Sequence, residues 1–259
     1  MPAQNVALKA VLTPVLIGGA SLAGRRFGHH VGGWLVALPM TSGPVAFFLA
    51  TDHGVSFAAG AAVGMLAGTI SQVAFALAYG STARKGATRA FFAGAVAFAA
   101  ATLALAFVHS PAVPTFGLVL LALGAASLLV RRRPPAPRPG EPRRPPRWDI
   151  PVRMVAATAV VLLITTSAPF LGAHLAGLLS PFPVFGAVVA VFTQRAHGPR
   201  AATQALDGLL LGLIAPAVFF VVLALTLPPT GLWAFAIAAV GALVAQGASV
   251  LAIPRDPDR

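Results

Sequence analysis

Apolar stretches of about 20 residues follow one another along most of the chain, and short polar segments separate them. Nine such stretches occur, at residues 6–24, 31–50, 55–79, 90–108, 114–130, 152–172, 174–193, 201–227 and 231–253. An α-helix of this length crosses a bilayer core of about 30 Å. The stretches do not alternate between apolar and polar with period two, so the pattern predicts membrane-spanning helices and excludes a transmembrane β-barrel.

A segment rich in proline and arginine interrupts the apolar pattern between residues 131 and 147. Proline combined with repelling like charges favours an extended, solvated linker. The predicted organisation is therefore a first four-helix repeat at 1–110, a linking helix at 111–130, a linker at 131–151, a second four-helix repeat at 152–254 and a tail at 255–259.

The two halves repeat each other when 144 is added to a residue number of the first half. This fixed offset aligns prolines, His-Gly pairs and phenylalanines of the two halves without a gap. Such residues rarely align by chance. Examples are His30 with His174, Pro39 with Pro183, His53-Gly54 with His197-Gly198, and Phe75 with Phe219. An internal duplication follows, and the single linking helix between the copies would insert the second copy upside down.

The basic residues support this inversion. If the linker is cytoplasmic, every lysine and arginine except Lys9 falls on the cytoplasmic side. Loops that are basic in one copy are neutral in the other, as Arg84-Lys85 against Pro228-Pro229 shows. We therefore expect an all-α polytopic protein of the cytoplasmic (inner) membrane. It would have nine transmembrane helices as two inverted four-helix repeats plus a linking helix, with the amino terminus outside and the carboxyl terminus inside.

Composition narrows the function classes. Hydrophobic residues make up 58% of the chain and charged residues 9%, where soluble domains carry about 25% charged. The net charge of +12 comes from short clusters between spans and from the linker, which argues against a nucleic-acid partner. Six acidic residues and no cysteine leave no paired carboxylates, no thiolate nucleophile and no Ser-His-Asp set. We therefore expect no enzyme activity, no cofactor and no metal site.

The strongest candidate site is a pair of interrupted spans. Proline lacks the N–H that a helix needs and clashes with the preceding turn, so spans two and seven should bend or open near Pro39 and Pro183. Helix breaks at matching positions of two inverted repeats form the solute site of many transporters. The candidate solute-binding residues are Pro39, Thr41, Ser42, Pro44, Ser180 and Pro183.

Other polar residues have both functional and structural readings. Asp207 is the only acid within a predicted span, so it is either a coupling site for protons or ions or a hydrated residue near the cytoplasmic boundary. Gln72 and Gln246 are candidates for lining a path or for bonding between helices. Lys9 and Arg153 occupy equivalent positions, where they either attract an anion or, as we expect, snorkel to the interface.

Histidines and glycines at the span ends have mainly structural readings. We expect His53-Gly54 and His197-Gly198 to form tight turns that end helices, and His29, His30 and His174 to lie at span ends. Glycines four residues apart, Gly60, Gly64 and Gly68 with Gly208 and Gly212 in the other copy, predict faces for close helix contact.

A family resemblance rests on two segments, Gly33-Trp-Leu-Val-Ala-Leu-Pro-Met-Thr-Ser-Gly-Pro-Val-Ala-Phe-Phe-Leu and Gly177-Leu-Leu-Ser-Pro-Phe-Pro-Val-Phe-Gly-Ala-Val-Val-Ala-Val-Phe. Both resemble the GlpM-like small bacterial membrane proteins, which are about half this length, so the likeness covers each half separately. The overall architecture is also similar to fused dual-topology transporters of the drug/metabolite kind, although those have five plus five spans.

Together these features predict a transporter or exporter of a small solute, with its site between the two repeats and the lipid bilayer as its partner. A passive channel with the same symmetry remains an alternative. So does a non-transporting membrane component of an assembly or biosynthetic system, and each reading is compatible with an oligomer.

Overall fold

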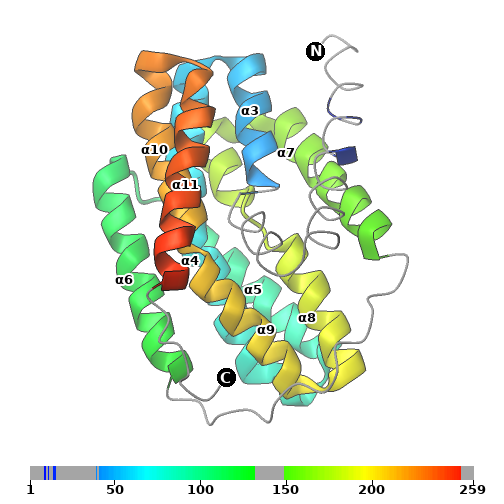
Figure 1. Cartoon of the computed structure of the whole chain (residues 1–259). Helices are drawn as coiled ribbons and strands as arrows, with labels where there is room; N and C mark the ends of the chain where they lie inside the picture. Colours follow the sequence, from blue (N-terminus) through cyan, green and yellow to red (C-terminus); the bar gives the residue numbers. More distant parts are fainter. Residues whose placement is uncertain are drawn as a thin grey trace.

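The computed structural model describes residues 9, 11, 14, 15, 39, 41–131 and 149–251 (Figure 1). Within these ranges it contains helices and no strand. They are α3 (Ser42–His53), α4 (Val55–Thr82), η1 (Ala83–Lys85), α5 (Ala87–Ala106), α6 (Ala112–Arg131), α7 (Asp149–Leu179), α8 (Val184–His197), α9 (Pro199–Gly212), α10 (Ile214–Thr230) and α11 (Trp233–Leu251). Most of the first predicted span, residues 31–38 of the second, His29, His30, most of the linker and the tail lie outside the described residues.

Five helical stretches are long and apolar enough to cross a membrane: Val55–Lys85, Ala87–Ala106, Ala112–Val130, Met154–Leu179 and Pro199–Thr230. The first joins α4 to η1, and the last joins α9 to α10. A sixth apolar stretch in α11, Trp233–Ala248, is shorter. The predicted all-helical class is confirmed for the described residues, and a multi-pass membrane protein is compatible with these helices, while the count of nine spans stays a prediction.

Single glycines turn the chain between helices. Gly54 separates α3 from α4 with φ 88°, Gly198 separates α8 from α9 with φ 87°, and Gly172 bends α7 with φ 72°. A residue with a Cβ is strained at such positive φ values, whereas glycine adopts them freely. The tight turns predicted after His53 and His197 are thus confirmed, and Gly172 marks the predicted end of span six.

Helix α4 lies at the centre of the fold and contacts α3, α5, α6, α7, α9 and α10. Of its most apolar window 67% is buried, against 22% for α5 and α6. Large apolar side chains are correspondingly exposed on the outer helices, among them Phe92 on α5, Leu121 on α6 and Val240 on α11. An outer surface of this kind suits hydrocarbon better than water.

The glycines of α4 let it approach α7 closely. A Cβ added at Gly64 would collide with the carbonyl oxygen of His174, and one at Gly177 would collide with the carbonyl oxygen of Ala61. The predicted contact face on span three is therefore confirmed. At Gly208 and Gly212 the described residues show no such contact, because no atom lies within 4 Å of an added Cβ.

Candidate functional site

The predicted break in span seven is present. Helix α7 ends at Leu179 and α8 begins at Val184, so four residues, Ser180-Pro-Phe-Pro183, interrupt the helical stretch. Pro181 and Pro183 have no N–H to donate, and each disfavours a helical conformation in the residue before it. Short turns replace the helical bonds: the amide of Phe182 donates to the carbonyl of Leu179 at 3.1 Å.

The other candidate break lies at the start of α3. Pro39 is half-buried and outside any helix, and α3 begins three residues later at Ser42. The amide of Gly43 donates to the carbonyl of Pro39 at 2.6 Å, which folds the segment into the first turn. Pro44 sits in that first turn, where a missing N–H costs no helical bond. Thr41 precedes the helix and its side chain makes no capping hydrogen bond.

The structure brings the start of α3 and the break in span seven together. The hydroxyl of Ser42 donates to the carbonyl of Ser180 at 3.3 Å, and both residues are buried. The Ser180 hydroxyl is also buried, and among the described residues it has no hydrogen-bond partner. A buried hydroxyl without a partner loses about 1–3 kcal/mol of solvation, so this oxygen is an available binding group.

Apolar groups from α4 and α5 surround the break in span seven. Phe182 packs edge-on against Phe75 at a ring distance of 6.2 Å and against Phe98 at 5.2 Å. On the same helix α4, a Cβ at Gly68 would lie 2.8 Å from both the carbonyl oxygen of Leu178 and the ring of Pro181. Glycine at position 68 therefore allows α4 to press against the interrupted backbone.

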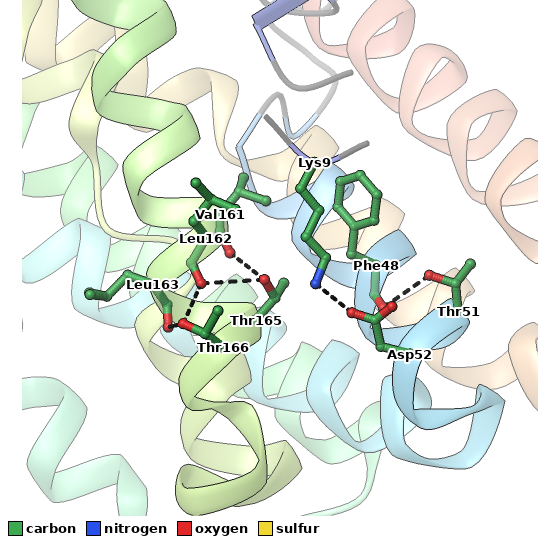
Figure 2. Close-up of polar contacts among 9 residues, drawn as sticks. All are labelled: Lys9, Phe48, Thr51, Asp52, Val161, Leu162, Leu163, Thr165 and Thr166. Atoms are coloured by element: carbon green, nitrogen blue, oxygen red, sulfur yellow. Dashed lines mark hydrogen bonds and ion pairs between the residues drawn. The ribbon is translucent and has the colours of Figure 1, made fainter. Parts of the chain in front are cut away.

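A second polar site, an ion pair, lies near the other end of α3. The Lys9 ammonium is 2.5 Å from the Asp52 carboxylate, and the two side chains are 0% and 7% exposed. The ammonium also lies 5.5 Å from the ring centre of Phe48. Figure 2 shows the Lys9 side chain between α3, which carries Asp52, and the segment of α7 around Thr165.

This pair corrects the interpretation of Lys9 as a snorkelling residue. Its ammonium turns into the protein, because a carboxylate compensates it there. Asp52 is not among the predicted site residues, because the predicted second span stops at residue 50, whereas α3 continues to His53. One sequence feature could have indicated this partner: Lys9 is the only basic residue predicted on the non-cytoplasmic side, and such a residue favours a nearby acid.

The remaining candidates lie on other helices. Asp207 is half-buried in α9, Gln72 is half-buried in α4 and Gln246 is half-buried in α11. Asp207 and Gln246 each have an interaction partner. The roles of Asp207 in coupling and of both glutamines in lining a path stay predictions.

The structure also brings together the rings of two histidines, a contact that the sequence pattern did not predict. The rings of His109 and His174 lie 4.8 Å apart, and Nε2 of His174 is 3.2 Å from the carbonyl oxygen of Leu105. Leu105 is in the last turn of α5, and its carbonyl also accepts the amide of Val108 at 3.0 Å, so His174 adds a second contact at that helix end. Within the described part of the chain, no three His, Asp or Glu side chains gather as a metal site requires.

Comparison of the chain with protein-family models, with curated proteins and with solved structures finds no match.

Proposed function

We propose that the chain is an integral membrane transporter or exporter of a small solute, which binds where the two helix breaks meet. The observation that carries this proposal is the buried contact between Ser42 and Ser180. It joins the start of α3 to the end of α7, and it leaves the hydroxyl of Ser180 without a described partner. Interrupted helices supply such free polar groups at the solute sites of transporters.

The lengths of the half-helices support a site at mid-depth. Helix α3 has 12 residues and α8 has 14. At 1.5 Å per residue they span about 18 and 21 Å, each more than half of a hydrocarbon core of about 30 Å. They run in opposite directions from the middle of the fold (Figure 1). A solute at their starting points would be about equally far from both membrane surfaces.

We also propose the inverted duplication, with nine spans in a 4+1+4 arrangement in the cytoplasmic membrane, each half similar to the GlpM-like proteins. Three features support it. The equivalent turns at Gly54 and Gly198 have nearly the same φ. Each turn is followed by an equivalent long helical stretch, α4 or α9–α10, and these two stretches run in opposite directions (Figure 1).

Burial of the break favours a transporter over the alternative of an open channel. Ser42 and Ser180 are 6% and 0% exposed, and phenylalanines lie against Phe182. A site closed in this way needs alternating access to exchange its solute with water on either side. Steady conductance of the purified protein in a planar bilayer would favour the channel.

We expect Ser180→Cys to react with a small, impermeant thiol reagent in membrane vesicles, because a transport cycle must expose the site to water. The native chain has no cysteine, so the introduced thiol is the only target. Labelling is measured by mass spectrometry in right-side-out and inverted vesicles. A solute that the protein transports should change the labelling rate, which turns the assay into a screen.

Two variants calibrate this measurement. Ser56→Cys places a thiol on an exposed residue and should label fully from one side. Ser71→Cys replaces a buried hydroxyl that accepts a bond from Thr102 at 2.9 Å between α4 and α5, so it should stay unlabelled. If S180C is as unreactive as S71C in both kinds of vesicle, the break is a packing feature and the proposed site is wrong.

The inverted topology has its own test. Ser56 and Arg200 are equivalent residues of the two halves, and both are exposed just after a glycine turn. We expect Ser56→Cys to label from outside the cell and Arg200→Cys from the cytoplasmic side, because the repeats are oppositely oriented. Labelling of both variants from the same side of intact cells or inverted vesicles would contradict the duplication model.

A further inference from the structure

Two opposite charges are buried side by side at the end of α3. Lys9 is 0% exposed, Asp52 is 7% exposed, and their charged atoms are 2.5 Å apart. Removing each ion from water costs several kcal/mol, and a buried pair often recovers less than this cost. Replacing a buried ion pair by apolar side chains of similar volume often leaves stability unchanged or raises it, so stability is a weak explanation for the pair.

The second half of the chain lacks the matching carboxylate. The residue equivalent to Lys9 is Arg153, but the residue equivalent to Asp52 is Ala196. If the halves are copies, one copy keeps its helices in place without this ion pair. Ionisable residues within membrane helices are rare and usually mark a transport or coupling pathway.

Charge balance indicates what the pair can do. While Asp52 is ionised, its carboxylate compensates the charge of the Lys9 ammonium. If Asp52 takes up a proton from water, the Lys9 cation is left without that counter-charge, at a cost of several kcal/mol. A small anion that takes the place of the carboxylate restores neutrality, and loss of the proton from Asp52 then expels the anion.

We infer that Lys9 and Asp52 form an exchangeable ion pair, in which the Lys9 ammonium binds a small monovalent anion, such as a carboxylate, when Asp52 is protonated. Proton and anion enter and leave together, so one cycle moves no net charge. This inference rests on the proposed transport function and adds to it a proton and an anion that are coupled to the transport cycle. Asp52 is the proton-accepting residue and Lys9 is the anion-binding residue.

Among the described residues, few other titratable side chains lie on α3 or on the helices packed against it. Helix α3 carries one further titratable side chain, His53, whose ring lies 4.9 Å from that of Phe57. Of the helices packed against α3, α4 contributes only Tyr79, far along the helix, and α7 contributes His174 and the terminal Asp149 and Arg153. Thr165 of α7 is buried, and its hydroxyl donates to the carbonyl of Val161 at 2.8 Å.

Helix α3 connects the ion pair to the break. Asp52 lies in its last turn and Ser42 begins it, which places them about 15 Å apart along the axis. A helix of this length moves as a rigid body, so release of Asp52 from Lys9 can shift Ser42 relative to Ser180. Binding of the anion at Lys9 would thereby alter the access of water and solute to the site at Ser42 and Ser180.

Anion binding to the purified full-length protein tests the inference without any transport. We expect Asp52→Asn to imitate the protonated state, so sodium acetate or chloride should raise its thermal midpoint more than that of the wild type at neutral pH. Sodium gluconate at equal ionic strength supplies the large-anion control. At anion concentrations one hundred times Kd, the rise should be about 5 °C or more. The wild type should gain the same response as the pH is lowered.

The double variant K9Q/D52N is the matched control, because it keeps two amides at the pair and removes the cation. It should show no specific response to acetate or chloride at any pH. If D52N does not fold, the acidified wild type supplies the same comparison with the double variant. An equal response in the double variant, or none in both D52N and the acidified wild type, overturns the inference. The S180C labelling is independent of this result, so a failure of the proposed site remains distinguishable.

Discussion

Gly64→Ala should prevent close packing of α4 on α7 and lower the stability of the protein by about 3 kcal/mol, the upper end of the usual cost of overpacking. The added Cβ would collide with the carbonyl oxygen of His174 and would lie 3.1 Å from backbone atoms of Gly177 and Leu178. Backbone atoms cannot rotate away as a side chain can, so the two helices must separate. We expect the thermal midpoint of the purified protein in detergent to fall by about 6 °C or more.

The equivalent residue of the other half provides the control. Gly208 corresponds to Gly64 in the repeat register, but an added Cβ there meets no described atom within 4 Å. Gly208→Ala should therefore leave the midpoint unchanged or raise it slightly, because alanine favours the helix by about 1 kcal/mol over glycine. Equal effects of the two substitutions would show that the helix contact does not depend on Gly64.

Lys9→Ala should destabilise the folded state by about 3–5 kcal/mol, because it leaves the Asp52 carboxylate buried without its cation. Asp52→Ala should cost a similar amount, because it leaves the buried ammonium uncompensated. The double variant K9M/D52L should recover most of the loss, since neither charge then remains. Reversible unfolding in mixed detergent micelles measures all three variants, and a double-mutant cycle isolates the coupling between the side chains.

Lys85 provides the reference for this cycle, because it is the other lysine of the chain and its side chain is exposed. Lys85→Ala should change the free energy of unfolding by no more than about 0.5 kcal/mol. If Lys9→Ala is equally mild, or if the double variant is as unstable as either single variant, the ion pair does not compensate buried charge.

Local sequence signals predicted the turns and the break well. Gly54 and Gly198 each follow a histidine at the end of an apolar stretch, and glycine is the residue that a positive φ requires. Pro181 and Pro183 remove two amide donors within a few residues, so no continuous helix can pass through them. Both features depend only on the conformational preferences of a few neighbouring residues, and these preferences follow directly from the residue types in the sequence.

Contacts between distant residues could not be read in the same way. Lys9 and Asp52 are 43 positions apart, and the contact between Ser42 and Ser180 joins residues 138 positions apart. Apolar periodicity does not say which face of one helix meets which face of another. Lys9 was therefore assigned to the interface, since a lone lysine near a span end has that preference when no partner is known.

The close contact between α4 and α7 also constrains how the chain is made. Gly64 can contact its partner Gly177 only after the ribosome has added roughly 110 more residues. At usual translation rates this takes about 5–20 s. During that interval the glycine face of α4 has only lipid or an insertion factor to cover it. Packing of α4 against α7 must therefore follow insertion of the segment around Gly177, and a truncated first half should be cleared by membrane proteases.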